Sequence, residues 1–292
     1  MLKKLIKFIS LTIAGILLIS GDVLGGYEAV QINGAVLSGV EIGEIAAGVI
    51  FVSEVTDTSF AGILRGTSGK VITVNWGDGN KEDKTLSGTS TDVLIFHNYG
   101  KAGNFIISLT GNLEDLTRIK YDNQKLSKFY FPSTLTSLTY LSLSNTSVTG
   151  DISSVSNLTS LTYLSLSNTS VTGDISSVSN LTNLTFLSLY STSVTGDISS
   201  LNTLTNLTEL DLFNSSVTYT TTIIPDSWQV IYVYDLNWDS ATVDQFIIDL
   251  DTPGRVADGV LNIAGNNAPR TSASDTALSN LLANGWEVTV NE

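Results

Sequence analysis

The sequence predicts a mainly β protein in which a small β-sandwich is followed by a short stacked solenoid and a β/α cap. The strongest observation is a repeat of 23 residues: 138–160 and 161–183 differ only at Ser160 against Asn183, and 184–206 follows closely. A unit this short cannot bury its own apolar face, so the copies must stack and share one core. Strand-like runs precede the repeats, and apolar residues at helical spacing follow them.

Composition supports a globular chain and narrows the classes of partner. The 292 residues are 42% hydrophobic, which is enough for a core shared by two or three structural units. Asp and Glu outnumber Lys and Arg by 28 to 14, giving a formal net charge of −14. An acidic surface repels phosphate backbones, so we expect no nucleic-acid partner. The absence of cysteine excludes disulfides, thiolate metal sites and a cysteine nucleophile.

The first segment, 1–26, is a hydrophobic anchor or a signal peptide. A basic start is followed by an uncharged, largely apolar run at 8–20, which is typical of a secretory signal and short of the ~20 residues that span a bilayer. The same segment has apolar residues at alternating spacings of four and three, as in a buried helical peg: Leu2, Ile6, Ile9, Ile13 and Ile16. Cleavage and retention both remain open.

Residues 27–46 form a predicted short-strand linker, and 47–112 form the predicted sandwich. Five strand-like runs alternate with turn residues in the second range. It contains a W-G-D-G turn followed by an aromatic strand pair, namely Trp76, Gly77, Asp78, Gly79, His97, Tyr99, Gly103 and Phe105. This pattern resembles the PKD-like, immunoglobulin-type domains of bacterial and phage surface proteins. The resemblance implies a spacer or presenting domain rather than an enzyme.

Residues 113–229 are the predicted solenoid, which begins with an atypical unit at 116–137. Each good copy carries L-x-x-L-x-L, which places Leu138, Leu141 and Leu143 in the core and turns Tyr140, Ser142 and Ser144 outward. On the far side of the coil, Ile152, Val155 and Leu158 return to the core. The units resemble leucine-rich repeats, although threonine occupies the usual asparagine position at Thr146, Thr169 and Thr192.

Residues 230–292 are the predicted β/α cap. We expect strands at 230–235, 260–263 and 286–290, and helices that bury Val243, Phe246, Ile247 and Leu250 and then Leu278, Leu281 and Leu282. These strands would extend the parallel sheet and close the open edge of the solenoid. The segments Asn267-Ala268-Pro269 and Gly285-Trp286 resemble the terminal cap of leucine-rich-repeat surface and virion proteins of Bacteroidota and their phages.

Outward positions of the repeats stack into columns that are candidates for ligand binding. Aromatic residues dominate recognition surfaces, and they recur here beside serines and acids. A column that only stabilises the sheet is the alternative interpretation. The candidate ligand-binding residues are Tyr140, Tyr163, Phe186, Tyr190, Glu209, Asp211 and Phe213.

A second column consists of the acids Asp151, Asp174 and Asp197, one in each Thr-Gly-Asp. If adjacent, they would lie about 5 Å apart, a spacing that favours a bound cation such as calcium. The alternative is that each carboxylate accepts backbone N–H bonds in a turn. We expect no other cofactor.

Catalysis finds little support in the sequence. His97 is the only histidine, and no G-x-S-x-G elbow accompanies it. The acids near the first cap helix lack the spacing of a glycosidase pair. The sequence therefore predicts a protein that is not an enzyme.

We expect a non-enzymatic extracellular recognition or structural protein, with a phage virion fibre, decoration or receptor-binding component as the first hypothesis. A secreted bacterial cell-surface adhesin with a cleaved signal peptide is the alternative, and a glycan depolymerase is a remote one. The expected partners are a host-surface glycan or protein, together with virion or cell-envelope proteins held through the N-terminal segment. Homo-oligomerisation remains open. The expected location is the virion surface or the cell exterior.

Overall fold

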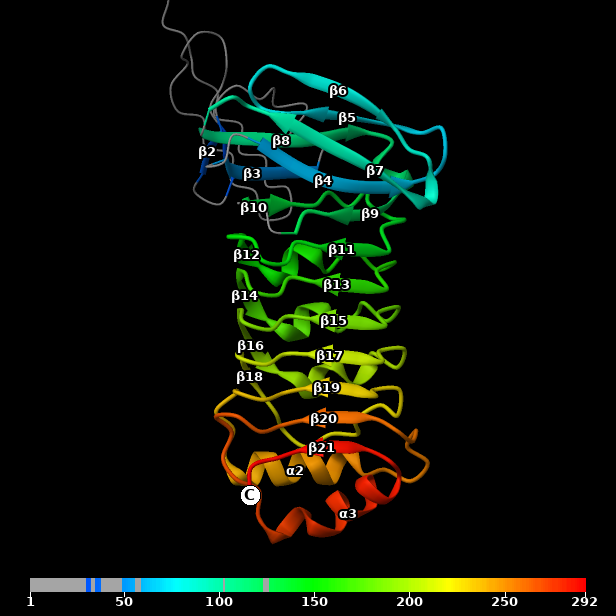
Figure 1. The fold of residues 1–292 in the computed structure, drawn as a ribbon, viewed down its shortest axis with the longest axis vertical. Helices are drawn as coiled ribbons and strands as arrows, with labels where there is room; N and C mark the ends of the chain where they lie inside the picture. The colour runs from blue at the N-terminus through cyan, green and yellow to red at the C-terminus, as the bar shows by residue number, and fades with distance from the viewer. Residues whose placement is uncertain (1–29, 33–34, 38–48, 56–58, 102, 123–125) are drawn as a thin grey trace, which may run out of the picture.

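The structure is an elongated stack with a β-sandwich at one end, single-coil repeats in the middle and two helices at the other end (Figure 1). This computed structural model describes residues 30–32, 35–37, 49–55, 59–101, 103–122 and 126–292. The predicted anchor at 1–26 lies outside the described residues. Of the predicted linker, the structure describes one antiparallel pair, formed by β1 (Val30–Ile32) and β2 (Ala35–Leu37).

The sandwich strands alternate buried and outward side chains. In β4, every second residue from Phe60 is buried, and the core also contains Trp76 and Ile95. Alternation is expected of strands that have one face on the core. The strands are β3 (Val49–Val55), β4 (Ser59–Gly66), β5 (Val71–Asn75), β6 (Lys81–Thr85), β7 (Gly88–Asn98) and β8 (Gly103–Gly111).

Both sheets of the sandwich continue into the solenoid. One sheet has the order β18-β16-β14-β12-β10-β3-β8-β5-β6, and the other has the order β21-β20-β19-β17-β15-β13-β11-β9-β4-β7. The junctions are antiparallel: β3 pairs with β10 (Leu126–Tyr130), and β4 pairs with β9 (Leu116–Lys120). The sandwich strands thus cover the first solenoid coil and continue its two sheets.

The repeats form coils with one strand in each sheet and a short 3₁₀ turn. The predicted core leucines Leu138, Leu141 and Leu143 are fully buried. The strands are β11 (Tyr140–Ser142), β12 (Thr149–Asp151), β13 (Tyr163–Ser165), β14 (Ser170–Asp174), β15 (Phe186–Ser188), β16 (Ser193–Asp197), β17 (Glu209–Asp211) and β18 (Ser216–Thr218). The 3₁₀ turns are η1 (Leu113–Asp115), η2 (Ile152–Val155), η3 (Ile175–Val178) and η4 (Ile198–Thr203).

The C-terminal elements extend the ten-stranded sheet in parallel, as predicted. They are β19 (Val230–Tyr232), α2 (Ser240–Leu250), β20 (Val260–Asn262), η5 (Ser272–Ser274), α3 (Asp275–Ala283) and β21 (Glu287–Thr289). Leu282 was predicted to face inward, but it is 52% exposed, because α3 buries the stripe containing Ala277, Leu278 and Leu281. No helix in the described part of the chain is long and apolar enough to cross a membrane.

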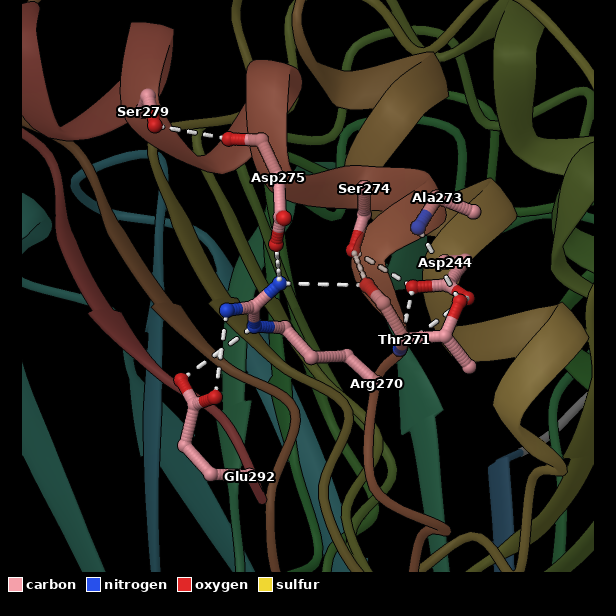
Figure 2. Close-up of polar contacts among 8 residues, drawn as sticks. All are labelled: Asp244, Arg270, Thr271, Ala273, Ser274, Asp275, Ser279 and Glu292. Atoms are coloured by element: carbon pink, nitrogen blue, oxygen red, sulfur yellow. Dashed lines mark hydrogen bonds and ion pairs between the residues drawn. The ribbon is translucent and has the colours of Figure 1, made fainter.

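A polar cluster fastens the two cap helices together (Figure 2). The buried carboxylate of Asp244 in α2 accepts hydrogen bonds from the backbone N–H of Thr271, at 3.0 Å, and from the hydroxyl of Ser274, at 2.6 Å. Arg270 forms ion pairs with Asp275 and Glu292. Every charged group of the cluster has a partner within it, so the cluster is a structural clamp.

Candidate binding face

Two ladders of stacked aromatic rings lie on the outer side of the ten-stranded sheet. The first ladder is Tyr140, Tyr163 and Phe186, whose successive ring centroids are 4.1 and 4.2 Å apart with interplanar angles of 8° and 3°. Parallel pairing sets Tyr140 opposite Tyr163 and Tyr163 opposite Phe186, because the repeats have equal length. The candidate column therefore forms a continuous stack.

A charged residue lies next to each end of the first ladder. The guanidinium carbon of Arg118 lies 3.7 Å from the ring centroid of Tyr140, and Glu209 is the strand partner of Phe186. Stacking at these distances covers the ring faces, so the half-buried rings expose their edges. A sugar stacks on the face of an aromatic ring, whereas polypeptide groups also pack well against ring edges.

The second ladder is Tyr190, Phe213 and Tyr234, with centroid separations of 4.5 and 4.4 Å. Tyr190 and Phe213 were predicted, and Tyr234 was missed. It follows Phe213 by 21 residues, after the repeat pattern has faded. Aligning the run that ends at Tyr234 with the run that ends at Phe213 would have revealed it, since Asp211 pairs with Tyr232. The two ladders with Arg118, Glu209 and Asp211 are called the ladder face below.

Beside the first ladder runs a chain of serine hydroxyls, two and four residues after its rings along each coil. The successive oxygen–oxygen distances are 3.5, 2.6, 3.2 and 2.5 Å along Ser142, Ser144, Ser165, Ser167 and Ser188. Ser142 donates to Asp122 at one end, and Ser188 donates to Asp211 at 3.2 Å at the other. The strand alternation predicted outward serines at these positions, but Ser142, Ser165 and Ser188 are at most 5% exposed. Short side chains flanked by ring stacks are covered by them.

The hydroxyl chain is short of one proton when both end carboxylates are ionised. Five hydroxyls supply five hydrogens to six contacts, counting the two contacts with Asp122 and Asp211. Protonation of Asp211 would supply the sixth. Burial raises the pKa of Asp211 to about 6; the negative charge of Glu209 adds to the rise, and the hydrogen bond from Ser188 opposes it. Burial also raises the pKa of Glu209.

The carboxylates of the predicted acidic column do not lie on directly paired strand positions, although the sequence predicted that they would. Asp151 lies opposite Thr172 in the strand pairing, and Asp174 lies opposite Thr195, so successive carboxylates are not strand partners. Each carboxylate caps a 3₁₀ turn: the Oδ1 atoms of Asp151, Asp174 and Asp197 accept the N–H of Ser153, Ser176 and Ser199 at 2.8, 2.9 and 2.8 Å.

Two acids of this column, Asp151 and Asp174, also lie over a glycine of the next coil. A Cβ on Gly173 would meet Oδ1 of Asp151 at 2.6 Å, and a Cβ on Gly196 would meet Oδ1 of Asp174 at 2.5 Å. Hydrogen bonds from Ser176 lower the pKa of Asp174. The described residues contain no group of three or more His, Asp or Glu side chains arranged to hold a metal ion. Calcium binding at this column stays a prediction.

The residues of the W-G-D-G motif gather into one aromatic cluster in the sandwich. His97 stacks on Trp76 at a centroid distance of 5.0 Å, and its Nε2 lies 2.7 Å from Oδ2 of Asp78. Tyr99 donates its hydroxyl to the carbonyl of Trp76 at 2.9 Å and stacks on Phe105. These contacts give the only histidine a packing role in the sandwich.

Comparison with known proteins locates the resemblance in the repeats. Residues 136–181 match a family model described as leucine-rich repeats in two copies. No curated protein matches the chain. Residues 136–181 are therefore leucine-rich repeats, within a mainly β chain.

Several solved structures resemble the chain over part of its length. An internalin from Listeria monocytogenes is 24% identical over 62% of this chain and 49% of its own, with a TM-score of 0.49. The leucine-rich-repeat ectodomain of the Arabidopsis thaliana receptor kinase SOBIR1 is 24% identical over 38% of this chain and 61% of its own, with a TM-score of 0.34. The Arabidopsis receptor kinase HAESA, in complex with a peptide hormone and a co-receptor, is 21% identical over 60% and 34%, with a TM-score of 0.39. The chain thus spans about half the length of the internalin it resembles.

Proposed function

We propose that this protein is a non-enzymatic recognition protein that binds a protein ligand through the ladder face, outside the cell or on a virion. The observation that carries the proposal is the outward display of two aromatic ladders whose ring edges are exposed. Aromatic side chains on a rigid sheet are ordered before a ligand arrives, so binding costs little conformational entropy. Covered ring faces favour a polypeptide over a glycan.

The finer assignments are also proposals. The strands from 49 to 111 are a PKD-like presenting module, which the contacts among Trp76, His97 and Tyr99 support. The chain is a phage virion fibre, decoration or receptor-binding component held through its N-terminal segment. The resemblance of the cap at 230–292 to proteins of Bacteroidota and their phages supports this setting.

A test of recognition uses the full chain, fluorescently labelled, on a panel of bacterial cells. We expect the variant Y140S/Y163S/F186S to lose binding while circular dichroism shows an intact fold. The matched control, T149S/T172S/T195S, alters exposed threonines on the other sheet and should bind normally. Protease treatment of the cells should remove binding, and periodate oxidation of their glycans should not. Equal binding by the triple variant and its control would contradict the proposal.

If the triple serine variant unfolds, Y140F/Y163F keeps both rings stacked and removes only their hydroxyl edges. Weaker binding by this variant with unchanged thermal stability would support recognition through the ladder face. Unchanged binding would assign the tyrosine hydroxyls no part in it.

The secreted adhesin is the second candidate, because the basic start and the apolar run at 8–20 are typical of a signal peptide. N-terminal sequencing of the mature protein separates the two settings. An intact Met1 in an assembled particle would exclude the secreted adhesin. A mature start near Gly26 would exclude the retained anchor.

A further inference from the structure

The two ends of the first ladder carry opposite charge. At one end Arg65, Arg118 and Lys120 lie on neighbouring strands, accompanied by the carboxylates Asp92 and Asp122. Arg118 has no ion pair within the described residues, and its Nε is buried without a hydrogen-bond partner. This end has three cations for two anions.

The other end holds the acids Glu209 and Asp211. Neither forms an ion pair with a described Lys, Arg or His, and the hydrogen bonds to Asp211, from the hydroxyl of Ser188 and the backbone N–H of Phe213, come from neutral donors. Burying a carboxylate without a cation costs free energy. The described residues supply no cation to these two acids, so a bound cation would complete the arrangement.

The surroundings of the acids select an organic cation. Calcium takes six to eight oxygen ligands, and the described residues offer no metal-binding group here. Phe186 is the strand partner of Glu209, and Phe213 follows Asp211 by two residues on the same face. Aromatic rings beside carboxylates suit an ammonium or guanidinium group, which gains both charge pairing and cation–π contact.

The ladder fixes the distance between its two ends. Arg118 and Glu209 are separated by four strand-to-strand steps through Tyr140, Tyr163 and Phe186. At the ~4.8 Å spacing of neighbouring strands, this is about 19 Å. An extended peptide rises ~3.3 Å per residue, so about six residues cover the distance.

We infer that the ligand of the ladder face is an extended peptide that places a carboxylate at Arg118 and, about six residues away, a lysine or arginine side chain at Glu209 and Asp211. Its intervening residues lie along the ring edges of Tyr140, Tyr163 and Phe186. This inference rests on the proposed function, since it names the chemistry of the ligand of the same face. The peptide lies along the stack, so its direction is set by charge.

The test is a display library of random nine-residue peptides selected on the full chain. On the wild type, we expect enrichment of peptides with an acid and a Lys or Arg five to seven residues apart. E209Q/D211N should lose the basic preference alone, and R118Q should lose the acidic preference alone. E209Q and D211N keep side-chain size, whereas R118Q removes the guanidinium and shortens the side chain, and circular dichroism checks each fold.

The outcomes distinguish a failure of the inferred charge pattern from a failure of the proposed recognition function. Enrichment without the paired charges, absent on Y140S/Y163S/F186S, would overturn the inference and leave recognition by the ladder face intact. If the wild type enriches no more peptides than that triple variant, the inference and the proposed function are both overturned. Binding to a glycan array alone would have the same consequence.

A double-mutant cycle then tests the contact itself. A synthetic enriched peptide should bind E209Q/D211N about tenfold or more weakly than the wild type. The same peptide with norleucine in place of lysine should bind both proteins equally. A tenfold loss that persists with norleucine would overturn the assignment of the cation to this end.

Discussion

At the scale of single residues, Asp211 opposes the stability of the fold at neutral pH. Burial raises its pKa to about 6, from 3.8 in an unfolded chain. Below about pH 4 the carboxyl is protonated in both states, so the stabilising contribution of its protonation is fully present. As pH rises through 6, the folded state must hold a buried charge and that contribution is lost.

Replacing Asp211 by Asn should therefore stabilise the protein at pH 7. We expect a gain of about 1 kcal/mol after allowing for partial solvent screening, or ~2–4 °C in Tm. The difference from the wild type should vanish near pH 4. Asp174→Asn is the control, because hydrogen bonds lower the pKa of Asp174 and no gain is expected. Thermal unfolding at both pH values measures the effect; a wild type as stable as Asp211→Asn at pH 7 would refute it.

Gly173 allows two neighbouring coils to pack closely. Its φ is +101°, and the space where a Cβ would lie is filled by the carboxylate of Asp151. Gly150, in the preceding coil, has a φ of +133° with nothing within 4 Å of the same position. Gly150→Ala should cost about 1 kcal/mol of backbone strain, and Gly173→Ala about 1–3 kcal/mol more through overpacking. Urea denaturation of the two variants gives the comparison, and equal losses would show that Asp151 moves aside freely.

The stacking of the candidate residues could be predicted where the repeat length holds, and Tyr234 was missed where that length changes. Equal repeat lengths placed Tyr140, Tyr163 and Phe186 in one column, and the structure stacks them. The pairing of Asp151 with Thr172 was unpredictable from the repeat length, because those strands pair at an offset of 21 rather than 23 residues. The serines are buried because neighbouring rings cover them. The alternation of inward and outward side chains along a single strand does not predict this burial.

At the scale of elements, the clamp around Asp244 decides whether the cap helices stay docked. Burial works against ionisation of Asp244, but the hydrogen bonds from Ser274 and Thr271 prevail and lower its pKa. Asp244→Ala would leave the hydroxyl of Ser274 and the N–H of Thr271 without their acceptor.

We expect Asp244→Ala to lower the free energy of unfolding by about 3 kcal/mol. Asp239→Ala is the matched control: it removes the N-cap of the same helix, a change worth about 1 kcal/mol. Denaturant titration followed by circular dichroism measures both. Equal losses would mean that the clamp adds nothing beyond ordinary helix capping.

The cap elements followed from local signals in the sequence. Asp239 caps α2, and the spacing of Val243, Phe246, Ile247 and Leu250 gave its buried stripe. In α3 the predicted inward residue Leu282 is exposed, and Ala277 is buried with Leu278 and Leu281.

At the scale of the whole molecule, the sandwich and the solenoid share both of their sheets. The change from strand-like runs to leucine-spaced repeats near residue 112 predicted a sandwich followed by a solenoid. Pairing between β4 and β9 joins strands far apart in sequence, and no local signal reports it. The sequence therefore predicted the strands and the repeats but not the continuity of their sheets.

This continuity predicts cooperative unfolding. We expect one thermal transition for the whole described region, monitored by near-UV absorbance of Trp76 in the sandwich and of Trp228 in the solenoid. Single-tryptophan variants that keep one of these residues isolate each signal. Two transitions separated by several degrees would show that the sheets break at the junction and that the sandwich folds as an independent unit.

Because the repeats have equal length, adding or removing one changes the distance between the two charged ends of the first ladder by one strand step. Removing 161–183 would bring the basic and acidic ends of the first ladder one strand step closer, from about 19 to about 14 Å, and leave both ends unchanged. Near-identical copies in a gene are sites of unequal recombination. The same sequence identity that gives each coil its shape thus lets a lineage change the distance between the two charged ends in a single genetic event.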